Sequence, residues 1–189
     1  MSAARSSTPP AELAALAARV TRPVVLVGLM GVGKTTVGRK LAAMLGRDFV
    51  DADEAIVEAA QRSIPEIFET YGEAYFRDGE RRVIARLIEE GHGVIATGGG
   101  AFIDPATRAT VLEKGIAVWI DCDIDTLVER TSRRGNRPLL KQGNPREILT
   151  RLAHERAPFY AQAHIHIVSE IGPHADTARA IIEAIDRWL

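Results

Sequence analysis

The stretch GLMGVGKT, residues 28–35, follows an apolar strand-like run and contains three glycines, a lysine and a threonine. Glycines let the backbone curl so that successive N–H groups point inward as an anion-binding nest, and a helix that begins there adds the positive end of its dipole. In the pattern GxxxxGK[ST], the lysine neutralises the β- and γ-phosphates of a nucleotide and the hydroxyl coordinates Mg²⁺. A plain strand-turn-helix corner would leave Lys34 and Thr35 unexplained. These residues therefore predict a site for a nucleoside triphosphate with magnesium.

Two acids, Asp51 and Asp53, stand at the end of the next strand-like run, DFVDAD. The alternation of a strand would place both on one side, at the carboxyl end where ligands gather in parallel sheets. One carboxylate could then support the magnesium ion, and the other could accept a proton from an attacking hydroxyl. The alternative is that Asp53 and Glu54 only open the following helix, because acids stabilise helix N-termini.

Three consecutive glycines, residues 98–100, end a further strand-like run in the sequence TGGGA. They suit close approach of the backbone to a ligand and an anion-binding turn, whereas a plain turn needs only one glycine. In EAYFRDGERRV, Arg77 follows two aromatic residues on a helical pattern, so its guanidinium could project toward a ligand. The alternative is a solvated arginine that pairs with Glu73 or Glu80 at helical spacing.

A basic segment, residues 132–146, carries four arginines and a lysine together with glycine and proline, but no regular period. We expect a mobile surface loop, which could either close over a phosphate site or be a basic excursion of the surface.

Asp121 ends the strand-like IAVWID and could serve a motor-type ATPase, but Asp121 and Asp123 also fit caps of the next helix. The sequence contains neither the Asn-Lys-x-Asp nor the Asp-x-x-Gly element of a guanine-nucleotide switch.

The elements that must position these residues alternate along the chain. Short apolar runs are separated by stretches with helical spacing of apolar residues, which favours a parallel sheet covered by helices on both faces. We therefore expect a three-layer α/β/α fold with a central parallel sheet of about five strands. The five strand-like runs span residues 23–28, 48–53, 93–98, 116–121 and 164–168.

Composition limits the class of protein. The chain has 189 residues, 46% of them hydrophobic and 26% charged, which is ordinary for a soluble globular domain. A net charge of −1 with mixed signs gives no basic face for nucleic acid or anionic lipid, so we expect a small-molecule partner and neither nucleic acid nor membrane. A single cysteine, Cys122, excludes an internal disulfide and suits a reducing cytoplasm.

The first 22 residues are small and rich in serine, alanine and proline, unlike the rest of the chain. We expect residues 1–22 to form a flexible leader with one short helix, followed by a single domain over residues 23–189 in which residues 132–146 form a mobile lid. An organelle transit peptide is the alternative for the leader.

Together these stretches resemble one family, the shikimate kinases, from about residue 23 to near the C-terminus. The elements that carry the resemblance follow one another in order: GLMGVGKTTVGRKLA, DAD, SIPEIFETYGEAYFRDGE, TGGGA, NRPLL and ERAPFY. The resemblance implies a P-loop NTPase fold of the nucleoside-monophosphate-kinase type. It also implies a monomeric, cytoplasmic enzyme that uses ATP and Mg²⁺ to phosphorylate the 3-hydroxyl of shikimate, in the pathway to the aromatic amino acids.

The resemblance also implies roles for individual residues. Asp53 would hold substrate hydroxyls and act as catalytic proton acceptor, together with Lys34 and Arg137 as catalytic cations. Thr35 and Asp51 would serve the metal. The residues implied for ATP are Gly31, Val32, Gly33, Lys34, Thr35, Thr36, Arg130 near adenine, and Arg137 from the closing lid. Those implied for the substrate and its carboxylate are Asp53, Arg77, Gly98, Gly99, Gly100 and Arg156.

Two departures and two rivals remain. Gly79 stands inside the helix that should carry Arg77 and lowers helix stability by about 1 kcal/mol relative to alanine, which could loosen the grip on substrate. The leader has no counterpart in the minimal family pattern. The nearest rival is another small-molecule kinase, for gluconate or a nucleoside monophosphate, and a more distant one is an ATP-binding switch that transfers no phosphate.

Overall fold

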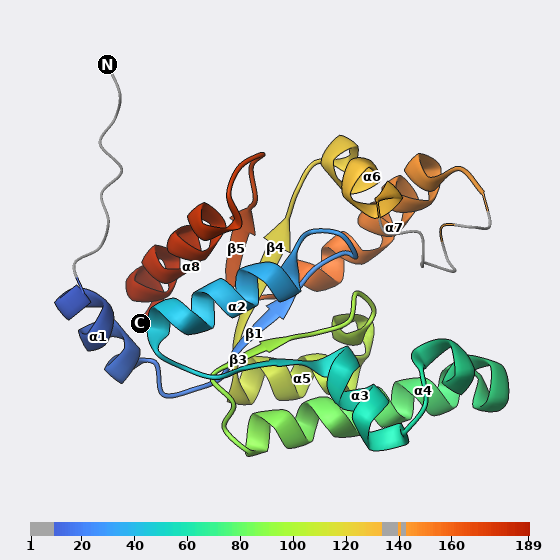
Figure 1. Cartoon of the computed structure of the whole chain (residues 1–189), viewed down its shortest axis with the longest axis horizontal. Coiled ribbons are helices and arrows are strands. Elements are labelled where there is room, and N and C mark those ends of the chain that lie inside the picture. Colours follow the sequence, from blue (N-terminus) through green and yellow to red (C-terminus); the bar gives the residue numbers. More distant parts are fainter. Residues whose placement is uncertain (1–9, 134–139, 141–142) are drawn as a thin grey trace.

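The computed structural model describes residues 10–133, 140 and 143–189. Its centre is a five-stranded parallel sheet in the order β2-β3-β1-β4-β5 (Figure 1). This arrangement confirms the predicted three-layer fold, and a strand lies within each of the five predicted runs. The strands are β1 (Val24–Val27), β2 (Phe49–Asp51), β3 (Val94–Ala96), β4 (Ile116–Asp121) and β5 (Ile165–Val168).

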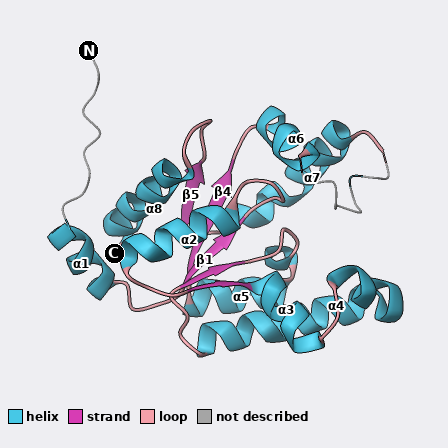
Figure 2. Cartoon of the chain, in the orientation of Figure 1, coloured by secondary structure: helices cyan, strands magenta, loops and turns pink. Residues whose placement is uncertain are grey.

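Helices cover both faces of the sheet, as Figure 2 shows in cyan around the magenta strands. The helices α2 and α8 pack against each other on one face, while α4 and α5 pack together on the other (Figure 1). The helical elements are α1 (Pro10–Arg19), α2 (Lys34–Leu45), α3 (Ala52–Ala60), α4 (Ile64–Glu89), the 3₁₀ turn η1 (Ala101–Ile103), α5 (Pro105–Lys114), α6 (Ile124–Ser132), α7 (Pro145–Tyr160) and α8 (His174–Trp188).

The core explains why the strands are apolar throughout. All four residues of β1 and the residues of β3 are buried, since each lies in a parallel sheet with helices above and below. The register aligns Val24 with Val94 of β3 and Ile116 of β4, so the three central strands end at the same edge. The polar residues that follow these strands therefore gather at one edge of the sheet.

Several helix ends follow the local sequence. Ser63 and Glu66 form a capping box at the start of α4, and Gly46 ends α2 in a left-handed conformation with φ of 62°. Asp123 accepts a hydrogen bond from the backbone N–H of Thr126 and so caps α6, as the sequence predicted for this acid.

The strand alternation expected for Asp51 and Asp53 is wrong. The strand β2 ends at Asp51, which caps α3 by accepting hydrogen bonds from the backbone N–H groups of Asp53 and Glu54. Asp53 therefore belongs to the first turn of a helix rather than to a strand. A short polar side chain that can bond the backbone ahead of it favours a helix start over a continued strand.

The helix α1 lies within the segment expected to be a leader. Its Leu16 and the following Val20 are buried, α1 packs against α2, and Arg19 pairs with Asp186 of α8 at 2.6 Å. The division into residues 1–22 and 23–189 stays a prediction. Within the described part of the chain, every helix is too short or too polar to cross a membrane.

Candidate active site

The phosphate loop connects β1 to α2 and curls around the side chain of Lys34. Gly28, Gly31 and Gly33 have φ angles of 141°, 87° and 95°, which only glycine adopts without strain. At Gly28 a Cβ atom would lie 2.3 Å from the Ile120 carbonyl oxygen, so the position also lacks room for a side chain. Lys34 Nζ donates hydrogen bonds to the carbonyls of Gly28 at 2.7 Å and Leu29 at 2.9 Å.

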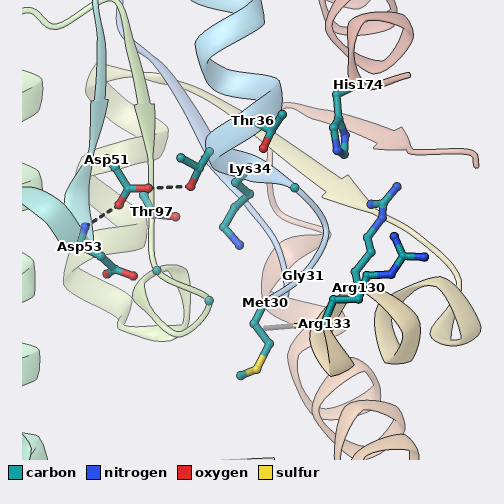
Figure 3. A pocket seen from close by; sticks show the side chains of 14 residues that line it. Met30, Gly31, Lys34, Thr36, Asp51, Asp53, Thr97, Arg130, Arg133 and His174 are labelled. Carbon is teal, nitrogen blue, oxygen red and sulfur yellow. Dashed lines mark hydrogen bonds between the residues drawn. The ribbon is translucent and has the colours of Figure 1, made fainter. Parts of the chain in front are cut away.

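This loop opens onto a cavity of about 360 Å³ at the carboxyl edge of the sheet (Figure 3). Backbone from the loop, acids from the β2–α3 junction and arginines from α6 meet around it. Its lining residues are Met30, Gly31, Gly33, Lys34, Thr35, Thr36, Asp51, Asp53, Thr97, Gly98, Gly99, Arg130, Arg133 and His174. Most of the expected nucleotide residues therefore lie around one space with the expected metal and proton-accepting residues, although Val32 is buried and is not among the lining residues.

Thr35 and Asp51 form the part of the wall that suits a magnesium ion. The Thr35 hydroxyl donates a 2.7 Å hydrogen bond to Oδ2 of Asp51. Mg²⁺ takes oxygen ligands and is usually held by one or two protein groups plus substrate phosphates and water. A hydroxyl and a carboxylate in contact beside the phosphate loop fit that requirement. Among the described residues, no group of three or more His, Cys, Asp or Glu could hold a metal without such help.

A buried glutamate, Glu80, lies beside Asp53 at the Gly98 side of the cavity. A Cβ at Gly98 would lie 3.0 Å from Oδ1 of Asp53 and 3.0 Å from Oε1 of Glu80, so both carboxylates face this glycine. Only 3% of the Glu80 side chain is exposed, and burial raises the pKa of its carboxyl. A 2.8 Å hydrogen bond from Arg77 acts against this rise in pKa. Glu80 thereby holds Arg77 in place with charge and hydrogen bonding together.

Arg77 and Arg156 approach the triple-glycine turn from two helices. A Cβ at Gly100 would lie 2.7 Å from Nη1 of Arg77, and Nη1 of Arg156 donates to the Gly99 carbonyl at 3.0 Å. The predicted pairing of Arg77 with acids is also present, since Glu73 lies at 3.5 Å and Glu80 at 2.8 Å. The two alternatives for Arg77 are thus compatible, because the acids orient a guanidinium that remains beside the turn.

The opposite wall is formed by Arg130, Arg133 and His174. Arg130 Nη1 donates to the Val32 carbonyl at 3.2 Å, which places it against the phosphate loop. His174 lies at the start of α8, where its ring would be 3.0 Å from a Cβ at Gly33. Figure 3 shows the side chains of Arg130 and His174 on the same side of the cavity. Arg137 and most of the expected lid lie outside the described residues.

The side chain of Cys122 is buried. It is 6% exposed, and burial raises its pKa to about 11. A thiol with this pKa stays protonated near neutral pH and is a poor nucleophile.

Sequence reasoning missed four residues of this region: Glu80, Thr97, Tyr160 and His174. For Glu80, expected only as a partner of Arg77, the available signal was an acid one helical turn from an arginine. Tyr160 ends the stretch ERAPFY, four residues after Arg156, but its contact with the carbonyl of Gly99 spans 61 residues of sequence. His174 reaches Gly33 from a different helix, and this contact leaves no local pattern.

A parallel sheet, a phosphate loop before α2 and an acid at the far side of the same cavity define the class of P-loop kinases. The comparisons with known proteins are more specific. The family model described as shikimate kinase matches residues 30–186. This chain belongs to the shikimate kinase family.

Individual relatives agree over nearly the whole chain. A shikimate kinase of Novosphingobium aromaticivorans is 66% identical over 182 residues, covering 94% of this chain and 94% of the relative. A shikimate kinase of Caulobacter vibrioides is 51% identical over 174 residues, covering 92% and 86%. The solved shikimate kinase of Acinetobacter baumannii in complex with shikimate has a TM-score of 0.85 and 38% identity, covering 95% of this chain and 98% of that one.

Proposed function

We propose that this chain transfers the γ-phosphoryl group of ATP to the 3-hydroxyl of shikimate, which gives shikimate 3-phosphate and ADP. The bond between the γ-phosphorus and the β–γ bridging oxygen breaks, a bond from the γ-phosphorus to the shikimate oxygen forms, and the hydroxyl proton leaves. Membership of the shikimate kinase family and the bound shikimate of the Acinetobacter baumannii relative support this acceptor.

One observation carries the proposal: the phosphate loop and Asp53 border the same cavity. Lys34, Asp53, Gly98 and Gly99 line it. Arg77 and Arg156 are not among the lining residues but lie beside the same triple-glycine turn. Phosphoryl transfer needs the donor and acceptor oxygens roughly in line at one site, with cations nearby to stabilise the charge. The lining residues supply both requirements.

The nucleotide end supplies charge and backbone donors. The amides of residues 31–36 cradle the phosphates at the N-terminus of α2, and Lys34 moves from its carbonyl partners to the β- and γ-phosphates. Arg130 lies beside the nucleoside, against the loop that it bonds. Arg137 reaches the phosphates from the lid, and lid closure excludes water that would otherwise compete as acceptor.

Thr35 and Asp51 would hold Mg²⁺, Thr35 with its hydroxyl and Asp51 with its carboxylate. When bound, this ion neutralises charge on the β- and γ-phosphates. Because Asp51 also caps α3, the same carboxylate connects the metal site to the helix that begins next to Asp53.

The acceptor end orients the hydroxyl and takes its proton. Asp53 accepts hydrogen bonds from the substrate hydroxyls and removes the proton from the attacking one. Arg77 and Arg156 bind the ring carboxylate, helped by a backbone N–H of residues 98–100, because guanidinium groups match carboxylates with paired hydrogen bonds. Two arginines on one carboxylate fix the orientation of the ring, whereas a single positive charge would only attract it. A fixed ring keeps the reacting hydroxyl in line with the γ-phosphate.

A coupled assay of ADP release tests the function. Shikimate, gluconate, AMP and CMP are offered as acceptors, each with and without EDTA. Shikimate-dependent ADP release that stops with EDTA is the expected result. ADP release with gluconate or a nucleoside monophosphate instead would assign another small-molecule kinase, and ADP release independent of all acceptors would favour a nucleotide-dependent switch. We expect a monomer that works in the cytoplasm, where its free cysteine stays reduced.

A further inference from the structure

Tyr160 and Arg156 donate to the same backbone oxygen in the triple-glycine turn. Tyr160 is the last residue of α7 and is 2% exposed. Its hydroxyl bonds the Gly99 carbonyl, and Arg156, one helical turn earlier, bonds that carbonyl at 3.0 Å. Residues four apart share a helix face, so both side chains reach one acceptor. A carbonyl oxygen has two lone pairs, and these two donors use both.

The peptide unit held in this way lies between the two ends of the cavity. A Cβ at Gly99 would be 3.3 Å from the backbone nitrogen of Met30 in the phosphate loop. A Cβ at Gly100 would be 2.7 Å from Nη1 of Arg77. Since both neighbours are in close contact, a rotation of this peptide would shift the turn against the phosphate loop and against the carboxylate-binding arginine.

Side chains add to the backbone hydrogen bonds that hold the turn, in which the N–H groups of Ala101 and Ile103 donate to the carbonyls of Gly98 and Gly100. Three consecutive glycines allow many backbone conformations and lose much entropy when they are ordered. Arg108 of α5 donates to the carbonyls of Phe102 at 3.1 Å and Ile103 at 3.0 Å, while α7 holds Gly99. In a trans peptide the N–H points away from the C=O, so holding the Gly99 carbonyl against α7 directs the Gly100 N–H the opposite way.

We propose that Tyr160 is a positioning residue for the phosphoryl acceptor: its hydroxyl fixes the Gly99 carbonyl and thereby orients both the triple-glycine turn and Arg156. This inference rests on the proposed function. Burial raises the pKa of the Tyr160 hydroxyl, so it remains a hydrogen-bond donor at physiological pH. Without it, Arg156 alone must satisfy the Gly99 carbonyl, and the turn and the guanidinium lose their common anchor.

The variant Tyr160→Phe removes one hydroxyl and keeps the ring that packs near Trp119, with centroids 5.8 Å apart. We expect KM for shikimate to rise about tenfold, the effect of removing one partner of a buried hydrogen bond, with KM for ATP within about twofold of wild type. The matched control is Tyr75→Phe, since Tyr75 is 57% exposed on α4, and it should leave both constants unchanged. A purely structural tyrosine would change both KM values alike or neither, and either result would overturn the proposal.

A double-mutant cycle tests whether Tyr160 acts through the anchor that it shares with Arg156. The variants are Tyr160→Phe, Arg156→Ala and the two combined, compared by KM for shikimate. Coupled residues give a combined rise smaller than the product of the single rises. A combined rise equal to that product would overturn action through the shared carbonyl.

Two controls keep the outcomes distinct. If Tyr160→Phe is unfolded at the assay temperature, both KM values are measured at a lower temperature at which it is folded, and an unchanged KM for shikimate there would overturn the proposal. Wild-type protein without shikimate-dependent ADP release would overturn the proposed function and this inference with it. Active wild-type protein with an unaffected Tyr160→Phe would overturn only the inference.

Discussion

The hydroxyl of Thr35 lies 2.7 Å from the carboxylate of Asp51, which joins the first turn of α2 to the end of β2. Asp51 also accepts the backbone N–H of Asp53 at 2.9 Å. One side chain thus connects the phosphate loop, the proposed metal site and the start of the helix that carries the proposed proton acceptor. The carboxylate of Asp51 thus links the two elements by hydrogen bonds.

Asp51→Asn should weaken the binding of Mg²⁺ without unfolding α3. Asparagine caps helices about as well as aspartate, so the helix start is kept while the negative charge is lost. The Mg²⁺ concentration for half-maximal activity should rise about tenfold, as expected for a metal-site carboxylate. Titration of activity with MgCl₂ measures it, with Thr35→Ser as the control that keeps the hydroxyl. An unchanged Mg²⁺ requirement would remove Asp51 from the metal site.

Asp53→Asn should abolish turnover while ATP still binds. Loss of a general base costs about 10²- to 10⁴-fold in rate, and Asp53 lies across the cavity from the phosphate loop. Single-turnover rates and ATP titration by calorimetry separate the two effects. Glu54→Gln, at the neighbouring exposed position, should have near-normal rates. Turnover within a few-fold of wild type for Asp53→Asn would exclude a catalytic base there.

Arg156→Ala should raise KM for shikimate by about a hundredfold, because charged hydrogen bonds to a carboxylate contribute roughly 1.5–3 kcal/mol each. The KM for ATP should change far less. Initial-rate kinetics with each substrate varied in turn measure this difference. Arg151→Ala is the matched control, because Arg151 lies on the same helix with a side chain that is 66% exposed. The carboxylate assignment fails if KM for shikimate stays at the wild-type value.

Gly79→Ala should stabilise the protein. Gly79 lies inside α4 with no atom within 4 Å of an added Cβ, so alanine adds helix propensity without a clash. The free energy of unfolding should rise by about 0.5–1 kcal/mol, measured by urea denaturation. Gly28→Ala is the contrasting variant, because its Cβ would collide with the Ile120 carbonyl, and it should be destabilised. A less stable Gly79→Ala would mean that the glycine is needed for the local conformation.

His92 lies at the edge of the sheet opposite the cavity, and its contribution to the free energy of unfolding depends on pH. The carboxylates of Asp48 and Glu90 raise the pKa of His92, and its hydrogen bond with His92 holds the pKa of Asp48 low against the effect of burial. A histidine with a raised pKa in the folded protein stabilises the fold at pH values below the histidine pKa of the unfolded chain, about 6.5. This stabilisation is lost as the pH rises through the pKa of the folded state. The lowered pKa of Asp48 acts in the opposite sense, so its contribution is lost as pH falls below about 4.

The variant His92→Gln should therefore lose more stability at pH 6 than at pH 9. Urea midpoints at the two pH values measure the difference, and His154→Gln, at an exposed position on α7, serves as the control. An equal loss at both pH values would show that packing, rather than charge, accounts for the role of His92.

The sequence predicted the elements whose signals are local. The glycine spacing, Lys34 and the preceding apolar run together specify the phosphate loop, and Ser63 with Glu66 specifies a helix start. The alternation at Asp51 and Asp53 failed because side-chain capping began a helix where a strand was expected. Both acids still reach the cavity, since a strand end and a first helical turn can face the same edge.

The contacts that complete the site could not be predicted from spacing. Tyr160 and Gly99 are 61 residues apart, and His174 comes to Gly33 only because α8 packs against α2. Glu80 is buried because α4 presents it beside Asp53, although a glutamate in a charged stretch usually faces solvent. Tertiary packing, rather than local sequence, decides each of these positions.

A crystal structure with a non-hydrolysable ATP analogue and shikimate tests the central claim most directly. The account predicts the γ-phosphate at Lys34, the shikimate 3-hydroxyl within hydrogen-bonding distance of Asp53, and the carboxylate held by Arg77 and Arg156 beside residues 98–100. Shikimate bound elsewhere, or Asp53, Arg77 and Arg156 facing separate surfaces in the complex, would contradict it.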